Sequence, residues 1–387
     1  MKIGITCYPT YGGSGAIATE LGIELSQRGH EVHFITYAQP FRLPHFMERV
    51  FFHEVEVARY PLFEYPPYDL ALAATMHEVV MREKLDLLHV HYAIPHATSA
   101  WIAREMLKDA FDLPVITTLH GTDITLVGQE RTFLELTRFS INHSQGITAV
   151  SEYLREETER RFGVPADRIE VVPNFVDVKQ YDRQRYPCRR DALIRTGERL
   201  IVHISNFRSV KRVRDVVRIF AAISHEVPSR LVLVGDGPDR PEASAEADLL
   251  GIADRVLFLG KQDSVAELLV CADLFLLPSE SESFGLVALE AMASRVPVIA
   301  TAVGGLPEVV VHGETGHLAP VGDVEGMAAA GVRILRDEDL WRRMGRAARE
   351  RAESQFSTER VIPRYEEYYE RVLRASPAEP AAWPETS

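Results

Sequence analysis

The strongest constraint on the fold is the repeated alternation of short apolar segments with longer helical segments. Apolar runs of this length are typical of buried strands, and strands separated by helices pair in parallel. The alternation therefore predicts an α/β protein with doubly wound parallel sheets. In the first part of the chain the predicted strands are Lys2–Thr6, Val32–Thr36, Leu87–Tyr92, Val115–His120, Gly146–Ser151 and Ile169–Pro173. The helices predicted there are Gly15–Arg28, Leu70–Lys84, Ala97–Lys108, Arg131–Asn142 and Glu152–Arg161.

A polar segment, residues 174–199, interrupts this pattern, which then starts again. A chain of 387 residues is also too long for one ordinary hydrophobic core. We therefore predict two Rossmann-like domains, residues 1–173 and 174–357, which face each other across a cleft. The second domain has five predicted strands, each followed by a helical segment: Leu200–Ser205, Leu231–Gly235, Val256–Gly260, Leu274–Leu277 and Val296–Ala300.

Three further segments stand outside this regular pattern. Residues 40–69 are rich in proline and aromatic side chains, and we predict an irregular region that gates a substrate site or forms a dimer contact. A last helix is predicted at Thr358–Ala375, and from the pattern alone it could belong to either domain. Residues 376–387 form a Pro/Ala-rich tail that is predicted to be disordered.

Charge and cysteine usage exclude several classes of protein. The formal net charge of -13 argues against a general nucleic-acid or anionic-membrane binder. The chain lacks an apolar stretch long enough to span a bilayer and a signal-peptide core, so we expect a cytoplasmic protein. Cys7, Cys188 and Cys271 are odd in number and lack CxxC spacing, so neither a disulfide framework nor a zinc site is predicted.

The first candidate site is a predicted strand-to-helix transition, residues 278–292. The helix is expected to begin at Phe284, with Ser281 and Ser283 as candidate N-caps and Gly285 in the first turn. A strand end, a short loop and a helix N-terminus together form an arrangement that binds anions.

Two carboxylates, Glu282 and Glu290, lie in this segment. Glu290 is the only ionisable residue between Phe284 and Ser294, so on this apolar helix its charge needs a partner. The hydroxyls of a sugar would satisfy it. Alternatively, Glu282 complements the helix dipole and Glu290 binds the backbone or solvent, and the pair alone does not decide between these interpretations.

A glycine-rich loop, GGSGAIA, follows the first predicted strand. Gly13, Gly15 and Ala18 match the dinucleotide fingerprint of dehydrogenases. The acidic residue that should end the second strand is missing, because Glu31 lies too early. The loop is therefore interpreted either as a phosphate- or carboxylate-binding turn or as a tight turn that needs glycine for its shape.

A basic cluster, SNFRSVKRVRD, follows the first strand of the second domain. Arg208 and Lys211 lie three residues apart, and the repulsion between such close charges would be relieved by a pyrophosphate. The alternative is a solvated basic face. The position at a strand's carboxyl end, where open parallel sheets bind ligands, favours a site.

Histidine and other polar residues gather at two strand ends of the first domain. His89 and His91 share one face of a strand, but the chain offers no further ligands at metal-site spacing. Tyr92, His120 and Thr122 lie at or just beyond strand ends and can point into the cleft.

Arg138 lies in an otherwise ordinary predicted helix. A surface salt bridge is one interpretation of this arginine, and a clamp for a substrate carboxylate is the other.

These residues carry a resemblance to a known family. The spacing of Glu282 and Glu290 is the Glu, seven residues, Glu motif, and the chain resembles the retaining GT-B glycosyltransferases that carry it, glycosyltransferase family four. Arg208 and Lys211 match the family's diphosphate-binding pair, and the segment VGDGP, residues 234–238, matches a nucleotide-site strand end. The resemblance covers about residues 1–375.

Four segments are similar to members of the family that join N-acetylglucosamine, from its UDP derivative, to L-malate in the first step of bacillithiol synthesis: GGSGAIATELG, HVHYAIPHA, residues 118–125 and SNFRSVKR. The resemblance implies a hexosyltransferase that needs no metal. It also implies an acceptor-binding first domain onto which the last helix packs back, and a second domain that binds the nucleotide sugar.

The resemblance also implies roles for individual residues. Catalytic roles fall to His120, Arg208, Lys211 and Glu282. Donor-binding roles fall to Gly15, Asn206, Arg208, Lys211, Gly235, Asp236, Glu282, Ser283, Phe284, Gly285, Leu286 and Glu290. Acceptor-binding roles fall to Gly13, Ser14, Tyr92, Thr122 and Arg138.

Several alternatives stay open at this point. The acceptor could be an inositol phosphate, a sugar or a glycan, and a nucleotide-sugar epimerase or hydrolase could use the same scaffold. Asp123 could serve as nucleophile or base. A homodimer is compatible with the sequence, whereas nucleic-acid and stable membrane partners are not expected.

Overall fold

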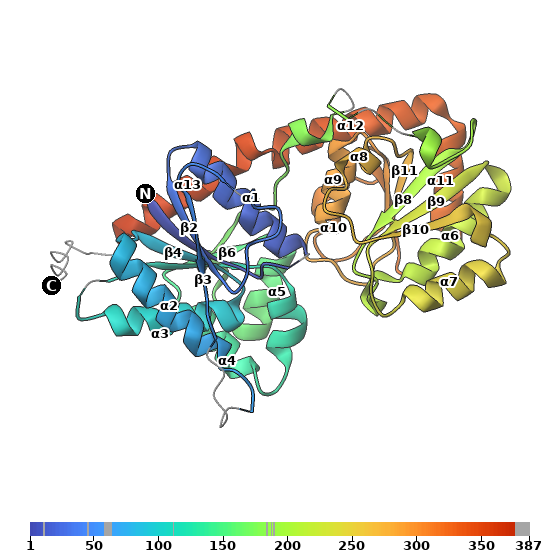
Figure 1. The fold of residues 1–387 in the computed structure, drawn as a ribbon. Coiled ribbons are helices and arrows are strands. Elements are labelled where there is room, and N and C mark those ends of the chain that lie inside the picture. Colours follow the sequence, from blue (N-terminus) through green and yellow to red (C-terminus); the bar gives the residue numbers. More distant parts are fainter. Residues whose placement is uncertain are drawn as a thin grey trace. The chain divides into compact units, whose positions relative to one another are not determined.

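The computed structural model describes residues 1–10, 12–44, 46–57, 64–110, 112–182, 185–186, 188 and 190–375. The predicted tail, residues 376–387, and part of the predicted irregular region, residues 58–63, lie outside the described residues. The chain divides into two compact units (Figure 1). The first consists of Met1–Pro173 and a segment that begins at Val361, and the second is Asn174–Arg360.

The first unit contains a parallel sheet with the strand order β3-β2-β1-β4-β5-β6-β7 among the described residues. Its strands are β1 (Lys2–Thr6), β2 (Glu31–Thr36), β3 (Val50–Glu54), β4 (Leu87–His91), β5 (Val115–Leu119), β6 (Gly146–Ala149) and β7 (Ile169–Val171). Its helices are α1 (Gly13–Gln27), α2 (Tyr68–Glu83), α3 (Thr98–Leu107), α4 (Leu134–Asn142), α5 (Glu152–Phe162) and most of α13 (Thr358–Ala375). Short helical turns are η1 (Ala93–Ala97), η2 (Thr122–Leu126), η3 (Val127–Gln129) and η4 (Ala166–Arg168).

Helices cover both faces of this sheet, as Figure 1 shows. On one face, buried side chains of α2 and α3 pack against Leu88 and Val90 of β4. The opposite face of β4 carries His89, whose Nδ1 lies 2.7 Å from the hydroxyl oxygen of Tyr369 on α13. Tyr368 of α13 accepts a hydrogen bond from the backbone N–H of Ile147 at 2.7 Å. The last helix therefore packs on the first unit through polar as well as apolar contacts.

Strand β3 corrects the prediction that residues 40–69 are irregular. It pairs with β2 over Val32↔Val50 to Thr36↔Glu54. Phe51 and Phe52 are exposed by 45% and 37%, so this edge strand is not a buried apolar run. The prediction failed because an edge strand needs neither alternation nor continuous burial to pair with its neighbour.

The second unit contains a parallel sheet with the order β10-β9-β8-β11-β12-β13, counted over the described residues. Its strands are β8 (Arg199–Ile204), β9 (Ser229–Val234), β10 (Val256–Gly260), β11 (Leu274–Leu277), β12 (Val298–Thr301) and β13 (Gly316–Ala319). Its helices are α6 (Val213–Glu226), α7 (Arg240–Leu249), α8 (Ala266–Leu269), α9 (Leu286–Ala293), α10 (Leu306–Val309), α11 (Val324–Arg336) and α12 (Glu338–Phe356). Its short turns are η5 (Val178–Tyr181), η6 (Arg190–Ala192), η7 (Ser209–Lys211) and η8 (Ala253–Arg255).

The edge strand β13 was not predicted. Its sequence, GHLA, contains glycine and histidine and therefore does not form a continuous apolar run. It pairs with β12 from Val298↔Gly316 to Thr301↔Ala319, so the pairing depends on the neighbouring strand rather than on local hydrophobicity.

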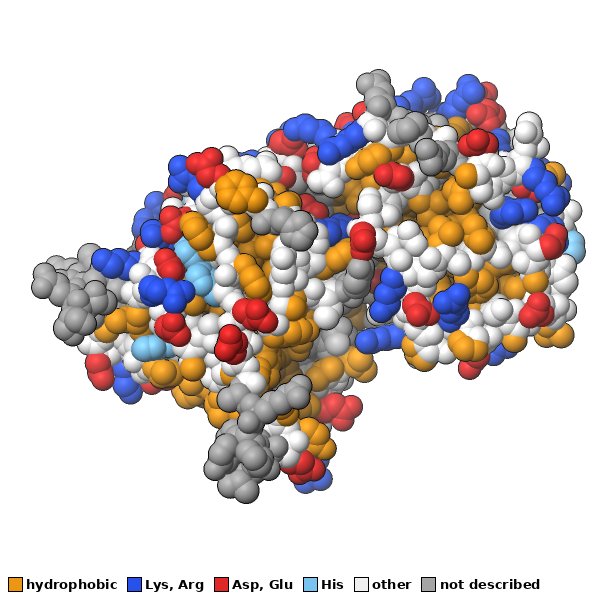
Figure 2. Space-filling model, in the orientation of Figure 1, with side chains coloured by type: hydrophobic (Ala, Val, Ile, Leu, Met, Phe, Trp, Pro, Cys, Tyr) orange, Lys and Arg blue, Asp and Glu red, His pale blue; other side chains and the backbone are white. Residues whose placement is uncertain are grey.

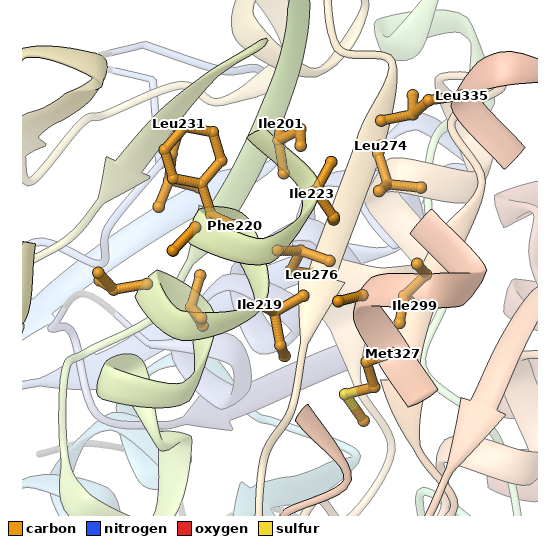
Figure 3. Packing of buried hydrophobic residues seen from close by; sticks show 14 of the residues in the cluster. Ile201, Ile219, Phe220, Ile223, Leu231, Leu274, Leu276, Ile299, Met327 and Leu335 are labelled. Atoms are coloured by element: carbon orange, nitrogen blue, oxygen red, sulfur yellow. The ribbon is translucent and has the colours of Figure 1, made fainter. Parts of the chain in front are cut away.

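The core of the second unit lies between its sheet and helices α6 and α11. Figure 3 shows Phe220 and Ile223 of α6 beside Leu231 of β9 and Leu276 of β11, all of them buried. Met327 of α11 belongs to the same cluster. The apolar face of α6 thereby fixes the helix to the strands whose ends carry the candidate site.

A disulfide joins Cys188 to Cys271, which lie 83 residues apart, with Cα atoms 5.3 Å from each other. The sequence indicated no disulfide, and this prediction was wrong. An odd number of cysteines without CxxC spacing carries no signal for a pair that only folding brings together.

The surface of the described residues carries charges of both signs. On the face that Figure 2 shows, Lys and Arg side chains are interspersed with Asp and Glu side chains on each unit. Both arginines of α6 take part in such pairs: Arg214 and Arg218 donate to Glu246 at 2.8 Å and 2.7 Å. Among the described helices, none combines the length and apolar character needed to cross a membrane.

Candidate active site

In the second unit, the candidate donor residues follow strands at the topological switch point of the sheet. β8 and β11 are neighbours although they are far apart in sequence, and the chain progresses outward from them in opposite directions. Loops that follow such a pair of strands diverge and leave a crevice for a ligand. Residues 205–212 follow β8, and residues 278–285 follow β11.

Backbone hydrogen bonds join these loops to each other and to the loop after β12. The N–H of Glu280 donates to the carbonyl oxygen of Val210 at 2.8 Å, and that of Gly305 donates to Glu282 at 3.0 Å. Thr301 donates its hydroxyl to the carbonyl oxygen of Ser279 at 2.5 Å. The loops after three adjacent strands therefore form one connected structure.

Two of the predicted catalytic side chains meet at this edge. Lys211 Nζ lies 2.6 Å from Glu282 Oε1, with side-chain exposures of 21% and 11%. The hydroxyl of Ser279 donates to the same carboxylate oxygen at 2.9 Å. The ammonium is thus held at the loop junction by a carboxylate, an arrangement that the sequence analysis did not predict.

Asn206 and Arg208 lie on the loop after β8, and both are exposed. Arg208 directly precedes η7, the turn that ends with Lys211. Because η7 is a single short turn, Arg208 and Lys211 lie on one loop rather than along a helix. A diphosphate at this loop would be met by both cations.

Glu290 is buried on α9, with 3% exposure. Its Oε1 accepts a hydrogen bond at 2.9 Å from the hydroxyl of Tyr181, which lies on η5. The protein itself therefore supplies a partner for this carboxylate, and a second role as a sugar ligand stays a prediction. Tyr181 was missed because nothing in the sequence joins η5 to α9.

The start of α9 differs from the prediction. The helix begins at Leu286, and its N-cap residue is Gly285, which has a φ of 93°, rather than Ser281 or Ser283. A Cβ on Gly285 would also lie 2.5 Å from Leu306 Cδ2. A left-handed conformation at this position is natural only for glycine, so the loop is shaped by backbone rather than by serine capping.

The other predicted donor residues are placed as follows. Gly235 follows β9 with a φ of 116°, and a Cβ there would lie 1.8 Å from the carbonyl oxygen of Ser205. Asp236 lies 3.6 Å from Arg240. Phe284 is buried, with its ring centroid 5.7 Å from that of Phe356. Ser283 and Leu286 are partly exposed beside them, and Gly15 belongs to the first unit.

A buried histidine supports the loop after β8. His203 has ring nitrogens 2.8 Å from the carbonyl oxygen of Leu276 and 2.8 Å from Ser205 Oγ. Burial lowers the pKa of His203 to about 4, so the ring is neutral at pH 7. This residue was also missed, although a histidine within an apolar strand is a visible irregularity.

In the first unit, three of the candidate acceptor residues, Gly13, Ser14 and Tyr92, follow β1 and β4, the strands at the topological switch point of the sheet. Tyr92 follows β4, and its hydroxyl donates to Ser14 Oγ at 2.9 Å. The Tyr92 ring lies 5.4 Å from His120 and 5.3 Å from Tyr8. Tyr92 therefore contacts two other predicted site residues, Ser14 and His120, as well as Tyr8.

Positive φ angles at non-glycine residues mark both candidate sites. Tyr92 has a φ of 90°, and Phe207 and Arg212 have φ angles of 40° and 51°. Such conformations are costly for residues with a Cβ, and they cluster at ligand sites.

The glycine-rich segment that was predicted as a loop forms the start of α1, and one of its glycines is required by close packing. Gly13 and Gly15 lie within α1, and a Cβ on Gly15 would lie 2.4 Å from the carbonyl oxygen of Tyr8. This glycine is therefore needed for close approach of the helix to the loop after β1. Ser14 is partly exposed and contacts Tyr92, as described above.

Asp123 is buried and braces two loops. Its Oδ2 accepts the backbone N–H of Ala93 at 3.0 Å, and its Oδ1 accepts those of Gly121 at 2.9 Å and His120 at 3.3 Å. Burial raises the pKa of this carboxyl, and the backbone hydrogen bonds oppose that shift. We assign Asp123 a supporting role, because its oxygens are committed to backbone donors.

Histidines near this site are engaged with protein atoms. His91 Nδ1 lies 2.8 Å from His120 Nε2, and His89 Nε2 lies 2.6 Å from Thr118 Oγ1. In the part of the chain that the structure describes, no group of three or more His, Cys, Asp or Glu residues is placed to hold a metal ion. Burial lowers the pKa of His120 to about 3.

Thr122 and Arg138 lie on neighbouring elements. Thr122 is exposed at the start of η2. Arg138, on α4, donates from Nη1 to Glu135 at 2.9 Å and from Nε to the carbonyl oxygen of Phe162 at 3.1 Å. The salt-bridge interpretation of Arg138 is thus realised, and its role as a malate clamp stays a prediction.

Comparisons with known proteins place this fold and site in a class. Residues 11–180 match the family model "Glycosyltransferase Family 4", and residues 187–351 match "Glycosyl transferases group 1". In solved structures, the fold is similar to a sucrose-phosphate synthase from Thermosynechococcus elongatus, with a TM-score of 0.79 and 24% identity, covering 97% of this chain and 100% of that one. The fold is therefore GT-B, and the protein is a glycosyltransferase.

Two curated relatives narrow the class. N-acetyl-alpha-D-glucosaminyl L-malate synthase of Bacillus anthracis is 52% identical over 375 residues, covering 97% of this chain and 98% of the relative. D-inositol 3-phosphate glycosyltransferase of Nocardia farcinica is 30% identical, covering 86% of this chain and 79% of the relative. The chain belongs to glycosyltransferase family 4, and the dehydrogenase interpretation of its glycine loop is excluded.

Proposed function

We propose that this protein transfers N-acetylglucosamine from UDP-N-acetylglucosamine to the hydroxyl of L-malate, with retention of configuration, as the first step of bacillithiol synthesis. The observation that carries the proposal is the 52% identity to N-acetyl-alpha-D-glucosaminyl L-malate synthase of Bacillus anthracis over 97% of this chain. The sugar transferred and the acceptor follow from that relative's name, and the arrangement of the site supports the chemistry.

The second unit is proposed to hold the donor. Lys211 and Arg208 follow β8 at the switch point and would neutralise the diphosphate as it leaves. Glu290, whose Oε1 accepts from Tyr181, would bind the ribose hydroxyls through its carboxylate. Glu282 would contact the donor sugar, together with the backbone of the loop before α9.

The first unit is proposed to hold malate and the reacting end of the sugar. Tyr92 and Ser14 offer hydroxyls, Thr122 offers another, and Arg138 offers a guanidinium for a carboxylate. Arg138 must then exchange its contact with Glu135 for one with malate. His120 is proposed to contact the donor sugar near the reacting carbon.

The proposed reaction needs no nucleophile from the protein. The malate hydroxyl oxygen forms a bond to the anomeric carbon on the face that UDP leaves, and the bond from that carbon to the β-phosphate oxygen breaks. The hydroxyl proton passes to a phosphate oxygen of the departing UDP. Metal is not required in this scheme, because Arg208 and Lys211 supply the positive charge.

The test is a turnover assay with product identification by mass. UDP release is expected only when UDP-N-acetylglucosamine and L-malate are both present, and the product mass should equal N-acetylglucosaminyl malate. Consumption of the donor without acceptor would instead indicate a hydrolase or epimerase.

A second candidate function is transfer to an inositol phosphate, which the relative from Nocardia farcinica supports at 30% identity. The two candidates differ in the acceptor anion, a dicarboxylate in one and a phosphate in the other. Inositol 3-phosphate in place of malate separates them in the same assay, and a faster rate with the phosphate would overturn the proposal.

A further inference from the structure

We infer that His91 fixes the tautomer of His120, so that His120 offers an Nδ1–H donor to a substrate oxygen. The tautomer assignment is independent of the proposed function. Only the statement that the acceptor of the Nδ1–H is a substrate oxygen rests on that function. His91 is a positioning residue in this scheme, because it contacts His120 rather than substrate.

The first step concerns His96, whose tautomer follows from its partner. The Nδ1 of His96 lies 2.5 Å from the backbone carbonyl oxygen of His91, and a carbonyl only accepts. His96 therefore carries its proton on Nδ1. The ring is fully buried, so its neutral form leaves Nε2 as an unprotonated nitrogen.

The second step concerns His91, which lies at the end of β4 and is also fully buried. Its Nδ1 and His120 Nε2 are 2.8 Å apart, so one of these two nitrogens donates to the other. His91 Nε2 is buried and makes no hydrogen bond to any described residue. The same holds, within the described structure, for His96 Nε2.

These facts distinguish the two tautomers of the pair. If His120 donated, His91 would have to carry its own proton on Nε2, and a buried N–H would stay without a partner. If His91 donates from Nδ1, its buried Nε2 is unprotonated, and the pair contains no buried N–H without a partner. Buried N–H groups without a partner are rarer than under-satisfied acceptors, so the second arrangement is favoured.

The consequence falls on His120. With Nε2 accepting from His91, neutral His120 carries its proton on Nδ1. The backbone N–H of His120 is held by Asp123 at 3.3 Å, and its ring lies 5.4 Å from that of Tyr92. The ring is thus oriented at two points, and its outer nitrogen is a donor suited to a sugar or malate hydroxyl oxygen rather than a base.

The test uses the full-length protein labelled with ¹⁵N in its histidine rings. Long-range ¹H–¹⁵N correlation at pH 7 should show His120 with a protonated Nδ1 and an unprotonated Nε2, and His120→Gln identifies the signals by their loss. A protonated Nε2 on His120 would overturn the inference. This readout needs no substrate, so it is independent of whether the proposed acceptor is correct.

Variants separate positioning from packing. His91→Leu should leave His120 without one defined tautomer and lower kcat by about 10- to 100-fold, the usual effect of removing an orienting partner. His91→Asn keeps an N–H donor close to the position of Nδ1 and should recover most of that loss. A wild-type His120 spectrum in His91→Leu would refute the inference.

The matched control is His89→Gln. His89 lies on the same face of β4 and bonds to Tyr369 and Thr118, but not directly to His120. This substitution should lower the unfolding midpoint and leave the His120 tautomer unchanged. If it disturbed the His120 signals as much as His91→Leu does, general packing rather than His91 would be the cause. Failure of the malate assay with an intact His120 tautomer would reject the proposed function alone.

Discussion

Tyr181→Phe tests how the carboxylate on α9 is held. Tyr181 and Glu290 are exposed by only 6% and 3%, and the hydroxyl lies 2.9 Å from Glu290 Oε1. Hydrogen bonds to charged groups contribute about 1.5–3 kcal/mol, and burial favours the upper part of that range. We therefore expect Tyr181→Phe to lower the free energy of unfolding of the second unit by about 2.5 kcal/mol.

The assay is urea unfolding followed by the fluorescence of Trp341, which lies in the second unit. Replacement of Trp101 and Trp383 by phenylalanine removes the other tryptophan signals. Glu290→Gln and the double variant complete a double-mutant cycle, for which we expect a coupling energy of about 1–2 kcal/mol.

Turnover provides a second readout of the same contact. If Glu290 binds the ribose, loss of the tyrosine hydroxyl should raise the KM for UDP-N-acetylglucosamine several-fold, with a smaller change in the KM for malate. A loss of stability below about 0.5 kcal/mol in Tyr181→Phe, together with an unchanged donor KM, would refute the reasoning for this pair.

Three further predictions concern charge. Lys211→Ala should lower kcat about 100- to 1,000-fold, because it removes a cation from the leaving diphosphate. Circular dichroism should show that the fold is retained. A wild-type kcat would mean that Lys211 has only a structural role. Arg138→Ala should mainly raise the malate KM in initial-rate assays, with Glu135→Ala as control for loss of the helix ion pair, and an unchanged KM would remove Arg138 from the site. Burial lowers the pKa of His89 to about 3 and that of His203 to about 4, from 6.5. Below pH 6.5 the unfolded chain therefore takes up protons that the folded chain does not, and stability should fall by about 1.4 kcal/mol per pH unit for each histidine until its folded pKa is reached. Urea unfolding at pH 7.0 and 5.5 measures this loss, and equal stabilities would contradict it.

The regular elements could be predicted because their signals are local. β1, β10, β11 and α13 have the predicted bounds, since apolar runs and helical periodicity are properties of neighbouring residues. The edge strands β3 and β13 were missed because their signal is not local. Each pairs with a strand that is already in place, and neither VFFHE nor GHLA is apolar throughout.

The chemical types of the site residues could also be predicted from the sequence. A glutamate pair at fixed spacing and a basic pair after a strand are visible along the chain, and strand ends in parallel sheets are where ligands bind. The partners of these residues were not predictable. Ser279 and Lys211 meet at Glu282 only because three loops are joined by backbone hydrogen bonds.

The sequence by itself determined the α/β class, two sheets and the residues available for phosphate, sugar and carboxylate binding, because each depends on local pattern. Only the tertiary structure decided which of these residues are already paired within the protein. Tyr181 with Glu290 and His91 with His120 are contacts across 109 and 29 residues. Their hydrogen bonds form only after packing has removed water from both partners, so no local pattern along the chain could specify them.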